Sequence, residues 1–179
     1  ISLHQAGIEN VVASSGTSLT VGQIRLVKRF SSNITMLFDG DAAGLKAAIR
    51  GLDLVLEQDM NVQVVALPDG EDPDSYLQKV GTTAFRDFLE KESKDFILFK
   101  TQLLIKETKG DPVKKAGLVK DIVQSIARIP DPIKRSLYIK ETSSLLELDE
   151  QMLVESMNRE LIEQVEQKKR EQRIADRRA

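Results

Sequence analysis

Apolar residues change their spacing about halfway along the chain, and this change predicts two differently built parts. In the first part, short β-branched or apolar runs alternate with stretches that repeat apolar residues every three or four positions. The runs lie at 10–13, 34–38 and 62–67. From about Ser93 onward only the helical spacing continues. The alternation predicts an α/β domain with a parallel sheet flanked by helices, followed by an all-α helical bundle.

Capping residues predict where the helices begin and end. Gly7 ends an initial helix, and Thr20 with Gln23 forms a capping-box pattern for the next, which runs to about Phe30. Further helices are expected at 42–58, 73–80, from Thr82, at 96–106, 112–129, 132–146 and from about Glu150. An N-cap followed by a first-turn proline occurs three times, at Asp72, Asp111 and Asp131.

The same change of spacing predicts the domain boundaries. Residues 1–92 are expected to form the α/β domain, and this domain looks incomplete at its front because no strand precedes the first helix. Residues 93–165 are expected to form the helical subdomain. Residues 166–179 lose the apolar stripe and gain basic residues, so a charged tail or linker is expected there. The chain also begins without Met, which favours an excised fragment.

The amino-acid composition excludes several kinds of catalytic and binding site. There is no Cys, which excludes disulfides, thiolate zinc sites and a Cys nucleophile, and the single His4 leaves little basis for Ser-His-Asp chemistry. Aromatic residues make up only 4% of the chain, so platforms for stacking nucleic-acid bases are few. The formal net charge of −2 gives no global attraction for nucleic acid, which would need a local patch or a segment outside this chain.

Pairs of carboxylates follow the second and third apolar runs. Asp39 and Asp41 follow the second run, and Asp72 and Asp74 follow the third. Neighbouring parallel strands would bring both pairs to one edge of the sheet, where α/β proteins bind their ligands. Like charges so close together require a cation or protons, and oxygen ligands without Cys or His suit Mg²⁺ or Mn²⁺. The pattern predicts a divalent-metal site.

Capping is the structural alternative for these acids. Asp41 and Asp72 can each serve as the N-cap of the helix that follows. Capping accounts for one acid in each pair, but it does not account for the repetition after two strands.

Phosphate contacts are a further expectation. The small-residue loop that contains Gly16 and Thr17 precedes a helix and can present backbone N–H groups to a phosphate, with an ordinary turn as the alternative. Lys46 and Arg50 lie four residues apart on the helix after the first acid pair, where they can meet phosphates or remain solvated surface charges.

Together these motifs resemble the Toprim domain, most closely that of the bacterial DNA primase family. The motifs are Ser-Gly-Thr-Ser at 15–18, Phe-Asp-Gly-Asp-Ala-Ala-Gly at 38–44, and Leu-Pro-Asp-Gly-Glu-Asp-Pro-Asp at 67–74. The first acid pair, Asp-x-Asp, is shared across Toprim proteins, whereas the third motif is more particular to primases. The resemblance covers about residues 1–88, and the helical remainder fits the family's C-terminal helical subdomain by position.

The resemblance implies a DNA-directed RNA polymerase, a nucleotidyltransferase that makes RNA primers on single-stranded DNA from ribonucleoside triphosphates during replication. It implies Mg²⁺ or Mn²⁺ held by Asp39 and Asp41. Asp72 and Asp74 would hold a second ion or position the ligands of the first through water. It also implies parts outside this chain, namely a zinc-binding domain, a catalytic subdomain, and a region that contacts the replicative helicase of the primosome. The implied location is the bacterial cytoplasm at the replication fork, without a membrane.

One departure from the family pattern matters. The family's first motif is a strand that ends in a catalytic Glu, and no residue of this chain matches it. The chain alone is therefore expected to be inactive.

Two other functions fit the pattern. One is another Toprim enzyme, a topoisomerase or a nuclease; a topoisomerase needs a nucleophilic Tyr, for which Tyr76 and Tyr138 are the candidates, both in helical patterns. The other is a non-enzymatic α/β module in which the acids bind a regulatory ion.

Overall fold

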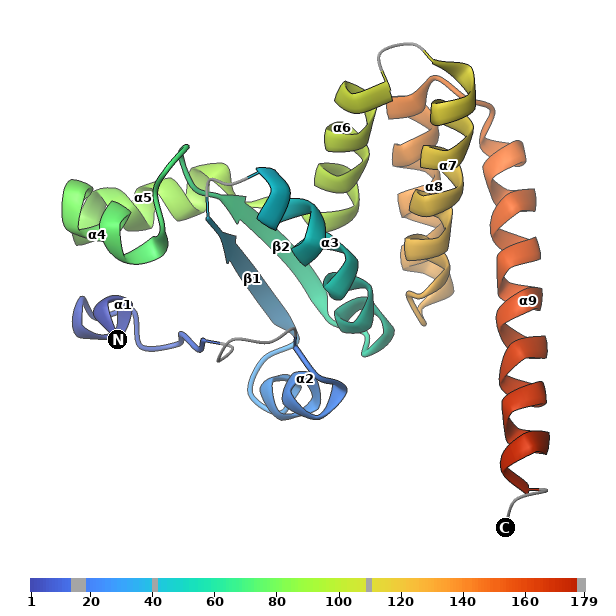
Figure 1. Ribbon diagram of the computed structural model, residues 1–179, viewed down its shortest axis with the longest axis horizontal. Helices are drawn as coiled ribbons and strands as arrows, with labels where there is room; N and C mark the ends of the chain where they lie inside the picture. Colours follow the sequence, from blue (N-terminus) through green and yellow to red (C-terminus); the bar gives the residue numbers. More distant parts are fainter. Residues whose placement is uncertain (14–18, 40–41, 109–110, 177–179) are drawn as a thin grey trace. The chain divides into compact units, whose positions relative to one another are not determined.

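The computed structural model describes residues 1–13, 19–39, 42–108 and 111–176 (Figure 1). The chain divides into two compact units, residues 1–99 and 100–179. The first unit is α/β and the second is helical, as the spacing of apolar residues predicted. Where the functional domains begin and end stays a prediction.

A small sheet organises the first unit. β1 (Asn33–Phe38) and β2 (Asn61–Ala66) pair in parallel, and the crossover between them is α3 (Ala42–Glu57), which packs against both strands. β2 carries the fully buried side chains of Val64 and Val65. This βαβ unit confirms the expected parallel pair.

The sheet also has a strand that the pattern did not predict. β3 (Lys94–Asp95) pairs antiparallel with β2, with Asp95 opposite Gln63 and Lys94 opposite Val64. Two residues are too few to show a period, and neither Lys nor Asp favours strands. Pairing with β2 satisfies backbone groups at an edge of the sheet. The sheet is therefore mixed and not purely parallel.

The β-branched run at 10–13 is not a strand, which corrects the sequence prediction. Val12 is 74% exposed, whereas Val11 packs against an apolar cluster formed by Leu3, Leu67, Leu77 and Phe85. β-Branched residues favour extended backbone, but a strand also needs a neighbouring strand to supply its hydrogen bonds. The run therefore contributes a core side chain without joining the sheet.

The short helices of the first unit lie where they were predicted, although α2 ends at Lys28, two residues before the expected end. They are α1 (Ser2–Gln5), α2 (Val21–Lys28), α4 (Pro73–Val80) and α5 (Thr82–Glu92). The capping box of α2 is formed: Gln23 N donates to Thr20 Oγ1 at 3.3 Å, and Thr20 N donates to Gln23 Oε1 at 2.9 Å. Gly81 separates α4 from α5 with a φ of 81°, which glycine adopts at little cost.

Four helices follow the sheet: α6 (Phe96–Thr108), α7 (Pro112–Ala127), α8 (Pro132–Leu146) and α9 (Glu150–Asp176). Asp111 and Asp131 cap α7 and α8, each accepting two backbone N–H groups through Oδ1. Figure 1 shows α7, α8 and α9 side by side, and their contacts bury Ile122, Ile126, Ile139 and Leu153. The predicted bundle is confirmed.

The segment expected to form a charged tail or linker is, as far as Asp176, the last part of α9. The helix continues through Asp176, and its residues from Val165 onward are exposed where the structure describes them. An Arg170–Glu166 ion pair of 3.8 Å, one turn apart, supports this helical end. In the described part of the chain, no helix is long and apolar enough to cross a membrane.

Candidate metal centre

The carboxyl ends of β1 and β2 lie next to each other. The Leu67 N–H donates to the Phe38 carbonyl at 2.9 Å, so the parallel pairing continues to the last residue of β1. Figure 1 shows both arrowheads at the same edge of the sheet. The exposed Asp39 follows β1 directly at this edge, where the segment 67–74 also leaves β2. Asp41 lies outside the described residues.

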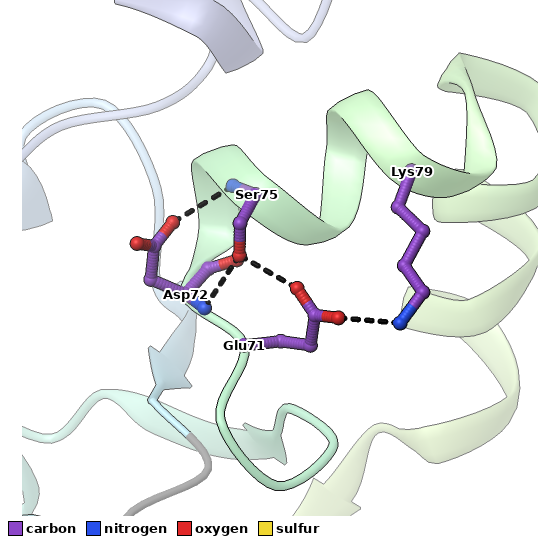
Figure 2. Close-up of polar contacts among 4 residues, drawn as sticks. All are labelled: Glu71, Asp72, Ser75 and Lys79. Atoms are coloured by element: carbon purple, nitrogen blue, oxygen red, sulfur yellow. Dashed lines mark hydrogen bonds and ion pairs between the residues drawn. The ribbon is translucent and has the colours of Figure 1, made fainter.

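Asp72 caps α4, as the capping alternative predicted. Its Oδ1 accepts the backbone N–H groups of Asp74 and Ser75, both at 2.8 Å, and Ser75 Oγ accepts the Asp72 N–H at 3.0 Å (Figure 2). Pro73 occupies the first helical position. Figure 2 shows the second carboxylate oxygen of Asp72 pointing away from α4. Capping uses one oxygen of Asp72, so the same side chain can present the other to a ligand.

The expected partner of Asp72, Asp74, lies in the first turn of α4. Its Oδ2 accepts a hydrogen bond from Gln78 Nε2 at 3.2 Å, one turn further along the helix. The side chain is exposed, and its negative charge is favourable at the positive end of the helix dipole.

Glu71 takes part in the polar contacts of this segment, although the sequence did not single it out. Its Oε2 accepts the Ser75 Oγ–H at 2.7 Å, and its Oε1 lies 2.6 Å from Lys79 Nζ. The hydrogen bonds from Lys79 and then from Ser75 hold the pKa of Glu71 below its ordinary value. The bond to Glu71 likewise raises the pKa of Lys79. Both side chains are therefore charged at neutral pH.

The described carboxylates fit a hydrated, hard divalent cation. Asp39, Asp72 and Asp74 offer only oxygen ligands and are exposed. Within the described ranges, no group of three or more His, Cys, Asp or Glu side chains is arranged to hold a metal. Mg²⁺ keeps several water ligands and is often bound through one or two carboxylates, so a partial set of acids is compatible with it. Membership of Asp39, Asp41, Asp72 and Asp74 in one site stays a prediction.

The expected phosphate contacts lie where the structure does not test them. Gly16 and Thr17 lie outside the described residues. Lys46 and Arg50 are on α3, but their side chains are not among the described ones.

The positions of the two tyrosines give no support to the topoisomerase alternative. The Tyr76 ring packs against Phe85 and Phe88, with ring centroids 6.0 and 4.8 Å apart. Tyr138 is partly buried on α8. Neither tyrosine follows a strand at the acidic edge of the sheet.

Known protein families match both units of the chain. The Toprim-like family model matches residues 1–77, and the model of the DnaB-helicase binding domain of primase matches residues 99–151. A DNA primase from Clostridium acetobutylicum is 35% identical over 90% of this chain and 27% of its own length. A DNA primase from Listeria monocytogenes is 32% identical over a similar share, so the chain spans about a quarter of the length of these relatives.

Solved structures of primases have the same fold. A crystal structure of a DNA primase domain from Pseudomonas aeruginosa superposes with a TM-score of 0.75 at 31% identity, covering 88% of this chain and 50% of that chain. A DnaG primase catalytic domain bound to single-stranded DNA gives a TM-score of 0.69 at 31% identity, covering 80% of this chain and 47% of that chain.

The βαβ unit with acids at its carboxyl edge and the match over residues 1–77 define the class of the first unit, which is a Toprim-like domain. Across both units the relatives are DNA primases, and the chain belongs to the bacterial DNA primase family.

The second match changes one expectation. The resemblance implied that the region contacting the replicative helicase lies outside this chain. The similarity to the DnaB-helicase binding domain of primase falls on residues 99–151, which are within it.

Proposed function

We propose that this chain supplies the metal-binding part of a DNA primase, a DNA-directed RNA polymerase that makes short RNA primers on single-stranded DNA. One observation supports the proposal. Two parallel strands end side by side at one edge of a Toprim-like sheet, and acidic residues follow each of them. Nucleotidyl transfer places charge on a phosphoryl group, and a divalent cation at this edge would neutralise that charge and orient the reacting oxygens.

In this proposal Asp39, Asp41, Asp72 and Asp74 hold Mg²⁺ or Mn²⁺. Asp72 also keeps its capping bonds, because these use Oδ1. Lys46 and Arg50 on α3, with Gly16 and Thr17, are the proposed contacts to the triphosphate.

The proposed partners follow from the relatives. One relative's catalytic domain was solved bound to single-stranded DNA, so we include a single-stranded template, with ribonucleoside triphosphates and the RNA primer as the other ligands. The match of residues 99–151 supports a contact between the helical unit and the replicative helicase. The proposed place of action is the bacterial cytoplasm, as for other proteins of the replication fork.

Primer synthesis by a chimera tests the function. The segment of the Clostridium acetobutylicum primase that aligns with this chain is replaced by this chain, and labelled RNA products are measured on single-stranded DNA with Mg²⁺. The chimera is expected to make primers, and Asp39→Ala or Asp41→Ala is expected to abolish them. Asp87→Asn, which removes an exposed carboxylate on α5, is the matched control and should leave synthesis unchanged.

Two results would contradict the proposal. Primer synthesis that survives Asp39→Ala would show that this acid is not part of the metal site. A folded chimera that makes no primers with all four acids intact would show that this chain cannot replace its relative.

A further inference from the structure

We infer that Glu71, Ser75 and Lys79 form a positioning cluster that fixes the metal-binding acid Asp72 before any cation arrives. The inference rests on the proposed function, because it assumes that Asp72 binds the metal. It adds three residues that contact neither substrate nor metal in that proposal but act through Asp72.

Ser75 joins the two halves of this cluster. Its Oγ accepts the Asp72 N–H at 3.0 Å, and its hydroxyl hydrogen is donated to Glu71 Oε2 at 2.7 Å. Its own N–H is donated to Asp72 Oδ1 at 2.8 Å. A serine hydroxyl rotates freely unless its partners orient it. Because Glu71 takes the hydroxyl hydrogen, an Oγ lone pair stays directed at the Asp72 backbone.

Lys79 in turn holds Glu71. The two residues are eight positions apart, so their 2.6 Å contact ties the loop before α4 to the last turn of that helix (Figure 2). The loop has a second restraint, because the Glu71 N–H donates to the Pro68 carbonyl at 3.0 Å. The Glu71 side chain is only 15% exposed, whereas Lys79 is 66% exposed. The Glu71 side chain is therefore shielded from water more than that of Lys79, and its bond to Ser75 is partly buried.

Stability alone is a weak explanation for this cluster. An ion pair with one solvated partner contributes little to folding. The N-caps of α7 and α8 use the same two backbone bonds without a reciprocal one, because their third helical residues are Lys114 and Lys134. The N-cap of α2 does form a reciprocal bond, through Gln23, so what sets α4 apart is the contact of its third helical residue, Ser75, with the Glu71–Lys79 pair. The additional contacts at α4 hold one orientation of Asp72, and such partners of metal ligands strengthen metal binding.

Mn²⁺ binding by the full 179-residue chain tests the inference, with free Mn²⁺ measured by electron paramagnetic resonance. The decisive variant is Lys79→Met. Loss of a nearby positive charge would by itself strengthen cation binding, whereas loss of positioning weakens it. We expect binding that is weaker by roughly tenfold, the lower end of the effect of removing such a partner. Lys79→Arg keeps the ion pair and should bind like the unmodified chain.

A second variant changes no charge. Ser75→Ala removes the hydroxyl that links Glu71 to Asp72 and should also weaken Mn²⁺ binding, and Ser75→Thr should restore it. Lys91→Met, which removes an exposed lysine from α5, is the matched control and should bind as tightly as the unmodified chain or slightly more tightly. Melting curves of each variant show whether it is folded.

The outcomes separate the inference from the proposed function. If Asp39→Asn weakens Mn²⁺ binding but Lys79→Met and Ser75→Ala do not, the positioning cluster is wrong and the metal site stands. If the unmodified chain does not bind Mn²⁺, or Asp39→Asn binds it equally well, the proposed site and the inference both fail.

Discussion

At the scale of single residues, Asp72 combines a structural task with a proposed chemical one. Replacing an N-cap Asp by Ala costs about 1 kcal/mol of unfolding free energy. Asp72→Ala is therefore expected to lose about this amount in urea denaturation and to bind Mn²⁺ more weakly. Asp131→Ala removes an equivalent cap from α8 and should lose similar stability without any effect on Mn²⁺ binding. Equal losses of Mn²⁺ binding in both variants would show that the effect comes from folding.

Asp39 should behave differently, because its exposed carboxylate follows β1 and is proposed to share a metal site with other acids. Without a cation the neighbouring carboxylates repel one another, and substitutions at such functional positions often leave stability unchanged or raise it. Asp39→Asn is expected to keep or raise the melting temperature and to weaken Mn²⁺ binding. A large drop in melting temperature would instead identify Asp39 as a structural residue.

The sequence predicts side-chain contacts between residues that are close together along the chain, but not contacts between residues that are far apart in sequence. The caps at Thr20, Asp72 and Asp131 were predictable because each uses partners two or three residues away. The Glu71–Lys79 pair could not be predicted in this way, because its two residues lie eight positions apart. A Glu within an acidic run would instead be interpreted as a further metal ligand or as a solvated surface charge. The burial of Lys100, which is 3% exposed and donates to Ser125 Oγ at 2.7 Å, depends on packing between α6 and α7 that no local pattern reports.

At the scale of elements, apolar spacing predicted β1, β2 and the long helices but not the smallest strand. The missed strand, β3, is made of Lys94 and Asp95, whose side chains do not favour strands, and its pairing follows from its place beside β2. The run at 10–13 shows the opposite case: its residues favour strands, but among the described residues no strand pairs with it. The spacing of hydrophobic residues indicates which side chains are buried. A strand also needs a neighbouring strand to pair with its backbone N–H and C=O groups, and the spacing does not show whether one is present.

The junction of α4 and α5 offers a test of this account of the fold. Gly81 has a φ of 81° and a ψ of 164°, a backbone region that only glycine adopts readily. Gly81→Ala is expected to lower the unfolding free energy by roughly 1–3 kcal/mol in urea denaturation. Gly51→Ala, inside α3 where an added Cβ meets no atom within 4 Å, should instead raise it, by roughly 0.5–1 kcal/mol. Equal effects of the two substitutions would contradict the assignment of Gly81 as a conformational requirement.

At the scale of the whole molecule, the chain carries acids that we propose bind a metal, but it has little attraction for nucleic acid. Its formal net charge is −2, whereas binding to a DNA backbone depends on neutralising phosphates with basic residues. The chain also spans only about a quarter of the length of its primase relatives. Incubation of the chain with single-stranded DNA, ribonucleoside triphosphates and Mn²⁺ is expected to give no labelled oligoribonucleotides. Products that disappear in Asp39→Ala would show that the chain is sufficient for synthesis.

The central claim is that the acids after β1 and β2 bind one divalent cation at the shared edge of the sheet. Anomalous scattering from a crystal soaked in Mn²⁺ tests it most directly, because it locates the ion itself. With few rigid ligands, binding is expected on the order of 1 mM, so the soak needs a higher concentration. The account predicts an anomalous peak contacted by Asp39 and by a carboxylate of the segment 67–74. A peak elsewhere on the chain, or one contacted by only one of the two acidic segments, would contradict it.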